Sequence, residues 1–239
     1  MSREQYELVE QKEVDNLLHL IKPVLGRLNK YLNENDHDLV FKREIVGSVS
    51  RGVVSRVRDG NKGFDVDINL VINHPGEGFK YNGKIVHDTF LNGLREAVKG
   101  TSFSYPEESS SVFTLKRIDH SKSKVVHGVD LAIIYYEPNG TMRFLQYNKS
   151  NGGFGFQKRD LLRNIADMKA EIINYYGGDE IIADCYIHNK NSNHDNNKQS
   201  FIIYVETINN LYNNIQKGYV ETINNLYNYD IYSGFLHLT

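Results

Sequence analysis

Residues 64–72 read Phe-Asp-Val-Asp-Ile-Asn-Leu-Val-Ile, and residues 128–134 read Gly-Val-Asp-Leu-Ala-Ile-Ile. Both stretches have the apolar content of a buried strand, yet the first carries Asp65 and Asp67 and the second carries Asp130. Because side chains alternate between the two faces of a strand, Asp65 and Asp67 are predicted on one face, opposite the apolar residues. If the two strands are neighbours in one sheet, the three carboxylates converge.

Three converging carboxylates need a partner, because like charges about 4 Å apart repel by roughly 4 kcal/mol at an effective dielectric near 20. A divalent cation supplies one, and a ligand set made only of oxygens favours Mg²⁺ or Mn²⁺. Two such ions, about 3.5–4 Å apart, clamp the attacking and leaving oxygens of a phosphoryl displacement. The competing interpretation of an Asp-x-Asp pair is a solvated sheet face, which is common in antiparallel sheets.

The segment upstream favours the metal interpretation. Residues 44–52 read Glu-Ile-Val-Gly-Ser-Val-Ser-Arg-Gly, so an apolar run stops at Gly47-Ser48 and a second glycine follows after Arg51. Glycine lets the backbone approach an anion closely, exposed amides and a serine hydroxyl donate to it, and arginine adds charge. Taken alone, Gly-Ser indicates only a turn. Ahead of the aspartates, it predicts a phosphate cradle.

In this order, Val46-Gly47-Ser48, Asp65-Val66-Asp67-Ile68 and Asp130 resemble the signature of the DNA polymerase beta-like nucleotidyltransferase superfamily. The gap of sixteen residues between Ser48 and Asp65 is somewhat long for that signature, and the excess is placed in the polar loop 58–63. The spelling Gly-Ser-Val-Ser-Arg-Gly-Val is most similar to the branch of oligoadenylate synthases, cyclic GMP-AMP synthase and their bacterial relatives. The resemblance covers residues 41–136.

The resemblance implies transfer of a nucleoside monophosphate from a nucleoside triphosphate to a hydroxyl, with release of pyrophosphate. It implies two Mg²⁺ or Mn²⁺ ions as cofactors. The catalytic residues and metal ligands that it implies are Asp65, Asp67 and Asp130. The nucleotide-binding residues are Gly47, Ser48 and, more weakly, Arg51.

The acceptor stays open. The product is a cyclic or oligomeric nucleotide signal, or the nucleotide is placed on a protein, an RNA end or a small molecule such as an antibiotic. A silent nucleotide-binding or partner-binding module is the third alternative, and the intact set of three aspartates disfavours it.

Composition predicts a soluble cytosolic protein. The 239 residues carry a formal net charge of −2, which does not favour a dedicated nucleic-acid partner, although a local groove can still be basic. The single cysteine, Cys185, excludes an intrachain disulfide. The first residues lack the apolar stretch of a secretory signal, and no run of 18 apolar residues predicts a membrane span.

The expected fold class is α/β (α+β), with a mixed twisted nucleotidyltransferase sheet followed by a mostly helical C-terminal region. The expected domains are 1–150 for the core with an N-terminal helix, 151–217 for the helical region and 218–239 for a duplicated terminal segment. Helical periodicity covers 14–32, where Pro23 is expected to kink or divide the helix, and 86–98. Strands are expected at 41–46, 64–73, 111–118, 125–136 and 142–147.

After about residue 150 the hydrophobic period changes from 2 to 3.6. The first turns of the expected helix carry basic residues that can reach a triphosphate or simply face solvent: Lys158, Arg159, Arg163 and Lys169. The asparagine-rich stretch 188–197 predicts a mobile loop, and its His188, His194 and Asp195 match no zinc spacing.

A decapeptide, Tyr-Val-Glu-Thr-Ile-Asn-Asn-Leu-Tyr-Asn, occurs at 204–213 and again at 219–228. Two identical copies indicate a tandem duplication rather than a solenoid, which needs at least three longer units. The first copy is expected to pack on residues 159–176 through Val205, Ile208, Leu211 and Ile215. The second copy, with Val220, Ile223, Leu226 and Tyr227, is expected to be mobile or loosely docked.

Overall fold

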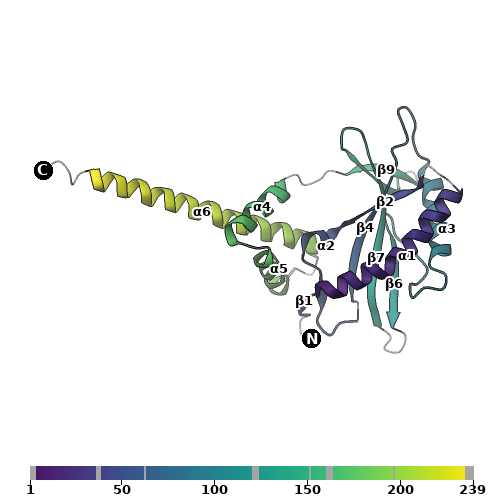
Figure 1. The fold of residues 1–239 in the computed structure, drawn as a ribbon, viewed down its shortest axis with the longest axis horizontal. Coiled ribbons are helices and arrows are strands. Elements are labelled where there is room, and N and C mark those ends of the chain that lie inside the picture. The colour runs from purple at the N-terminus through teal and green to yellow at the C-terminus, as the bar shows by residue number, and fades with distance from the viewer. Residues whose placement is uncertain are drawn as a thin grey trace. The chain divides into compact units, whose positions relative to one another are not determined.

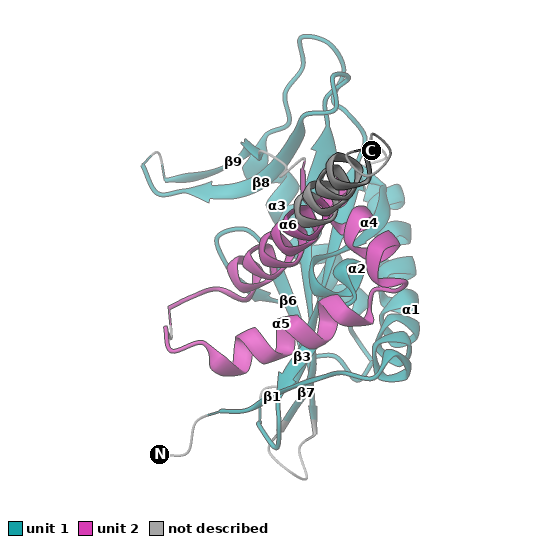
Figure 2. Cartoon of the chain, turned by 90° about the vertical axis from the view of Figure 1, so that its left-hand side faces the viewer, with its two compact units in different colours: residues 1–161 teal, residues 162–239 magenta. Residues whose placement is uncertain are grey.

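The computed structural model describes residues 4–35, 39–61, 63–119, 124–150, 152–159, 164–195 and 197–234; for 119, 124 and 220–234 it describes the backbone only. The chain divides into two compact units, Met1–Leu161 and Leu162–Thr239 (Figure 2). Each unit is described by itself below. None of the helices in the described ranges combines the length and the apolar character needed to cross a membrane.

The elements follow one another along the chain as Figure 1 shows. The first unit contains β1 (Tyr6–Leu8), α1 (Gln11–Asn35), β2 (Phe41–Val46), α2 (Gly47–Arg51), β3 (Ser55–Val57), β4 (Phe64–Ile72), α3 (Gly83–Ala97), β5 (Glu107–Glu108), β6 (Phe113–Asp119), β7 (Lys124–Tyr136), β8 (Met142–Asn148) and β9 (Gly153–Arg159). The second unit contains α4 (Asn164–Tyr176), α5 (Glu180–Ser192) and α6 (Ser200–Gly234).

The main sheet of the first unit is mixed. Within the described residues it has seven strands, in the order β2-β4-β7-β6-β5, with β8 paired to β7 and β9 to β8. β4 and β7 are parallel, whereas β2 pairs with β4, and β6 and β8 pair with β7, in antiparallel fashion. The predicted fold class and the mixed sheet are therefore confirmed. β1 and β3 form a separate two-stranded sheet that the sequence did not reveal.

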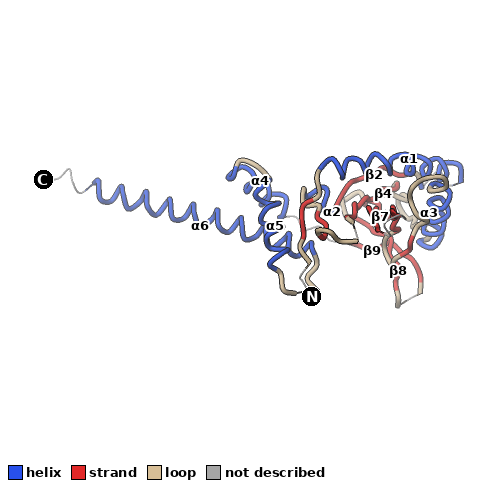
Figure 3. The backbone as a smooth tube through the Cα atoms, turned by 90° about the horizontal axis from the view of Figure 1, so that it is seen from below, coloured by secondary structure: helices blue, strands red, loops and turns tan. Residues whose placement is uncertain are grey.

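One face of the sheet is packed against α1 and α3, which lie together on the same side of the strands (Figure 3). The alternation in β4 explains this, because every second residue from Phe64 to Ile72 is buried, with no more than 3% of its surface exposed. Burial of an aliphatic or aromatic side chain of this size stabilises the fold by about 1.5–3 kcal/mol. The opposite face of β4, which carries Asp65 and Asp67, is thereby directed away from the two helices.

Helix α1 is continuous through Pro23, so the predicted division near Lys22 is wrong. A proline in a helix removes one backbone hydrogen bond. Pro23 is exposed, and its neighbours Ile21 and Val24 are buried. Pro23 therefore lies on the solvated side of the helix, and the buried stripe on the other side packs into the core.

The sheet extends further along the chain than the sequence indicated. Residues 153–159 form β9, which pairs with β8 along its whole length, so the expected helix beginning near residue 150 is wrong there. Helical structure begins at Asn164 instead. Phe154 and Phe156 alternate with glycine and pack on the main core, and this period of two was overlooked.

Helix α5 also corrects the sequence analysis. It runs from Glu180 to Ser192, so the first half of the asparagine-rich stretch is helical rather than a loop. Ile182 and Tyr186 are buried, and Asn189 donates its amide to the Thr207 hydroxyl at 2.9 Å. Packing within the second unit therefore overrides the local composition.

Helix α6 runs without interruption through both copies of the decapeptide. In the first copy Ile208 and Leu211 are buried, and so is Ile215 just beyond it. α6 contacts both α4 and α5, and Gln216 donates to Glu171 of α4 at 2.7 Å, as expected for packing on 159–176. The predicted stripe of the second copy lies outside the residues whose side chains are described.

Truncation after Lys217 is expected to lower the Tm of the helical unit by no more than a few degrees. Among the described residues, it removes the ring pair of Tyr175 and Tyr219, whose centroids are 5.7 Å apart, and such a pair stabilises by about 0.5–1.5 kcal/mol. Ile208→Ala is the positive control and should cost about 2–5 kcal/mol, because it empties a fully buried position. Circular dichroism melts measure both; a truncated chain that does not fold would show that the second copy is essential.

Candidate active site

The register of β4 and β7 places the three aspartates together. Asp67 lies opposite Asp130, and Asp65 lies opposite Gly128, on two adjacent parallel strands. The three side chains share the face that α1 and α3 leave uncovered, because their neighbours Val66 and Val129 are fully buried on the other face. The expected pairing of the two aspartate-bearing strands is therefore present in the structure.

Electrostatics shows that the carboxylates affect one another. Burial raises the pKa of Asp67, and the charge of Asp130 raises it further. Burial also raises the pKa of Asp65, followed by the charges of Asp130 and Asp67. Asp65 is exposed as a whole residue, but its carboxylate lies against the backbone of β7, which accounts for the burial. Burial, and after it the charge of Asp130, therefore makes ionisation of both aspartates less favourable than in water.

The Gly47-Ser48 turn packs directly on Asp67. β2 ends at Val46, which lies opposite Asp67, and the chain then turns at Gly47 with φ of +67°. A Cβ at position 47 would lie 1.8 Å from Asp67 Oδ2, so only glycine fits. The Ser48 backbone N–H donates to the Asp67 carboxylate and lowers its pKa. Gly47 and Ser48 form the first turn of the short helix α2.

Gly128 has the same function on the other strand, and the sequence analysis did not single it out. A Cβ at position 128 would lie 1.9 Å from Asp65 Oδ1. The glycine therefore makes room for the carboxylate of the neighbouring strand. Its position two residues before Asp130 was the available signal, but its significance depends on a pairing that is not visible in the sequence.

Strand β6 contributes two polar residues that were also missed. Thr114 lies opposite Asp130, and its hydroxyl donates to Asp130 Oδ1 at 2.5 Å. Lys116 lies opposite Gly128, and its charge lowers the pKa of Asp65. The Lys116 ammonium also pairs with Glu107 at 2.6 Å.

Two arginines lie near enough to Asp67 for their charges to lower its pKa. Arg51, the last residue of α2, has the larger effect, and Arg159 of β9 has a smaller one. The Arg159 guanidinium lies 5.1 Å from the centre of the Phe144 ring. Arg159 was expected on a helix, but it reaches this face from the last strand of the sheet. Arg163 lies outside the described residues.

The donor set suits a hard divalent cation, because it consists of carboxylate oxygens. Within the described part of the chain, however, no three His, Cys, Asp or Glu side chains are grouped closely enough to form a complete metal cage. Mg²⁺ does not require one, since it is usually held by one or two carboxylates together with substrate phosphates and water. Asp65, Asp67 and Asp130 do not form such a group by themselves, so further ligands would have to come from a bound molecule.

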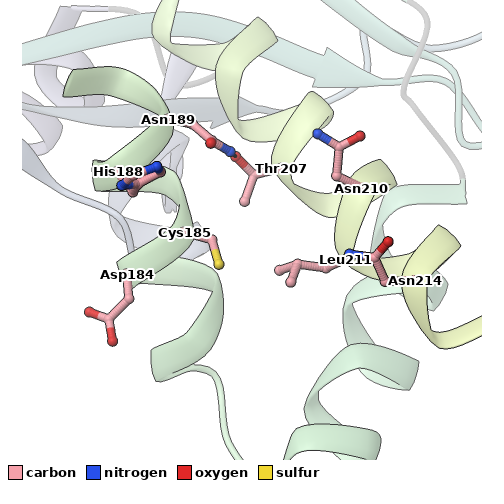
Figure 4. A pocket seen from close by; sticks show the side chains of 8 residues that line it. All are labelled: Asp184, Cys185, His188, Asn189, Thr207, Asn210, Leu211 and Asn214. Atoms are coloured by element: carbon pink, nitrogen blue, oxygen red, sulfur yellow. Dashed lines mark hydrogen bonds between the residues drawn. The ribbon is translucent and has the colours of Figure 1, made fainter. Parts of the chain in front are cut away.

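A hollow of about 390 Å³ lies in the second unit, between α5 and α6 (Figure 4). Cys185 and His188 line it from α5, and Leu211 and Asn214 line it from α6. The same absence of a metal-binding group applies to these described residues. It contains none of the predicted catalytic residues.

The fold resembles that of bacterial nucleotidyltransferases of known structure. Vibrio cholerae DncV in its GTP-bound form, elsewhere described as a cyclic AMP-GMP synthase, matches with a TM-score of 0.61 and 11% identity, over 85% of this chain and 67% of DncV. Escherichia coli DncV in its 3'-deoxy GTP-bound form gives 0.55 and 13%, over 85% and 68%. CdnC of E. coli MS115-1 with ATP gives 0.49 and 17%, over 87% and 62%.

The chain therefore shares its fold with the two DncV structures, in agreement with the fold that the order of the motifs implied. It spans 62–68% of the length of these three neighbours. At identities of 11–17%, the likeness shows the fold alone. No family model matches the sequence, and no curated protein matches it significantly.

Gly47→Ala is expected to destabilise the first unit by more than the cost of the left-handed backbone, which is about 1–2 kcal/mol for a residue with a Cβ. The excess comes from the clash with Asp67 Oδ2. Gly100→Ala is the matched control, because Gly100 has φ of +70° and nothing within 4 Å of a Cβ. Urea unfolding measures both variants, and equal losses would show that Gly47 does not pack on the carboxylate.

Proposed function

We propose that this chain is a metal-dependent nucleotidyltransferase, which transfers a nucleoside monophosphate from a nucleoside triphosphate to a hydroxyl acceptor. The observation that carries the proposal is the coupled set of three carboxylates on adjacent strands, with raised pKa values at Asp65 and Asp67. Such a set is a costly arrangement for an ordinary sheet surface, because its members repel one another. It becomes favourable when a cation and a triphosphate arrive together.

Each residue of the site has a proposed role that follows from its position. Asp65 and Asp67 would hold the divalent ions, which neutralise the triphosphate and stabilise charge developing at the reacting phosphorus when bound. The Gly47-Ser48 turn would contact the outer phosphates, and Arg51 would add positive charge beside Asp67. Asp130 would complete the second ion's ligands. The geometry of the first unit alone supports these roles.

The chemical step needs no protein nucleophile. The acceptor hydroxyl oxygen forms a bond to the α-phosphorus, the bond from that phosphorus to the bridging oxygen breaks, and pyrophosphate leaves with the electron pair. Asp130 would assist loss of the hydroxyl proton, which passes to solvent water, while its Oδ1 accepts from Thr114. Positioning and charge neutralisation supply the rate enhancement in transfers of this kind.

For the acceptor, we propose the hydroxyl of a second nucleotide, which gives a cyclic or oligomeric nucleotide signal in the cytosol. The spelling of the Gly-Ser turn supports this, and so do the structural neighbours, whose names include a cyclic AMP-GMP synthase and complexes with GTP and 3'-deoxy ATP. Transfer to a protein, an RNA end or a small molecule is the alternative outcome of the test below.

The test incubates the full chain with each α-³²P-labelled nucleoside triphosphate and Mg²⁺ or Mn²⁺, singly and in pairs, and resolves the products by chromatography. We expect a phosphatase-resistant labelled nucleotide product and pyrophosphate. Label on an added protein, RNA or small molecule would select the alternative acceptor. Nucleotide binding without any pyrophosphate release under all conditions would contradict the enzymatic proposal.

Asp67→Asn should abolish product formation and leave the unliganded chain at least as stable. Because the folded pKa of Asp67 is raised, the unfolded chain ionises first, and the free energy of unfolding falls as the pH rises through that pKa. A neutral asparagine at this position escapes this loss, so the Tm at pH 7 should rise by up to a few degrees. Asp167→Asn, at an exposed position in the first turn of α4, is the control: it should leave product formation unchanged and lower the Tm slightly, because it removes a charge that favours the helix N-terminus. Full activity in Asp67→Asn would show that this aspartate binds no essential ion.

A further inference from the structure

The neighbour of Asp130 on strand β6 is Thr114, a residue outside the motifs that carry the nucleotidyltransferase resemblance. The two residues lie opposite each other in the antiparallel pair of β6 and β7. The Thr114 hydroxyl donates to Asp130 Oδ1 at 2.5 Å, the length of a hydrogen bond to an ionised acceptor. Both residues are half-buried, so the bond is shielded in part from competing water.

This bond restricts the orientation of the Asp130 carboxylate. A carboxylate on a strand rotates about its last torsion with little preference between orientations. The branched Cβ of threonine restricts rotation about χ1. The direction of the hydroxyl that donates to Oδ1 is therefore also restricted. With Oδ1 accepting from Thr114 on the β6 side, Oδ2 is the oxygen of Asp130 that a cation could still use.

We infer that Thr114 is a positioning residue: it orients Asp130 as a ligand for the divalent cation of the proposed transferase. The inference rests on the proposed function. It adds a residue from a third strand to the site, since Asp65 and Asp67 come from β4 and Asp130 from β7. Hydrogen-bond partners of metal ligands typically contribute 10- to 100-fold to metal affinity or activity.

A purely structural role is the competing explanation, because threonine is common in strands for its packing alone. The two explanations differ in what the hydroxyl does. Thr114→Val keeps the branched shape and removes the donor, whereas Thr114→Ser keeps the donor and removes a methyl group. A positioning role is lost in the first variant and kept in the second, and a packing role shows the reverse.

The experiment titrates an equimolar mixture of Mn²⁺ and a non-hydrolysable nucleoside triphosphate into the full chain and follows protein-bound Mn²⁺ by electron paramagnetic resonance, with the nucleotide alone as the blank. We expect the Kd for Mn²⁺ to rise 10-fold or more in Thr114→Val and to stay within about 3-fold of wild type in Thr114→Ser. Where turnover is measured, the Mg²⁺ concentration for half-maximal rate should shift in the same order. Thermal melts confirm that each variant is folded, and Thr114→Ala replaces Thr114→Val if the latter is not.

Equal Mn²⁺ affinity in wild type and Thr114→Val would overturn this inference and leave the proposed function standing. Weaker binding in Thr114→Ser than in Thr114→Val would also overturn it, in favour of packing. A wild-type chain that binds no Mn²⁺ and releases no pyrophosphate would overturn both the inference and the proposed function.

Discussion

Repulsion among three carboxylates on two adjacent strands is the constraint on which the rest of this structure depends. Burial, and after it the charge of Asp130, raises the pKa of both Asp65 and Asp67, so the sheet must hold these like charges in register. The opposite face supplies that hold. Val66, Ile68 and Leu70 of β4 are almost completely buried beneath α1 and α3, and a slip of one residue would exchange them with the aspartates.

Two glycines let the backbone of neighbouring segments approach the aspartate carboxylates closely. Gly47 lies against Asp67 and Gly128 lies against Asp65, and in each case a single Cβ would overlap a carboxylate oxygen. These contacts partly remove the carboxylates from water, which raises their pKa values, while the Ser48 N–H, Arg51 and Lys116 lower them. The raising effects are the larger ones, so the pKa values of Asp65 and Asp67 stay above their usual value. A bound cation beside these carboxylates would favour their ionised forms. This is the property that metal-assisted phosphoryl transfer requires.

Local patterns were sufficient for the strands that carry the motifs. The alternation of apolar and polar residues in 64–72 predicted which face of the strand is buried. That prediction needs no knowledge of the neighbouring strands, because side chains alternate between the two faces of any strand. The parallel pairing of β4 with β7, and therefore the convergence of Asp67 with Asp130, depended on a contact between residues 63 positions apart. Hydrophobic periodicity cannot predict a contact between distant residues. The expectation of this pairing came from the order of the motifs and the family that they resemble.

The missed features share a non-local origin. Thr114 and Gly128 have meaning only beside Asp130 and Asp65, and Arg159 was placed on a helix because the weak alternation of Phe154 and Phe156 was overlooked. In the second unit, asparagine-rich composition predicted a loop where burial of Ile182 and Tyr186 maintains helix α5. In each case tertiary packing decides the outcome, and composition describes only the local preference.

The most direct test of the account is a crystal structure of the full chain with Mn²⁺ and a non-hydrolysable nucleoside triphosphate, with the ions located by anomalous scattering. The account predicts an anomalous peak within about 2.0–2.3 Å of carboxylate oxygens from Asp65 and Asp67, bridged to the triphosphate, whose outer phosphates lie at Gly47 and Ser48. An ordered nucleotide with its ions elsewhere, and with no peak at Asp65 and Asp67, would contradict it.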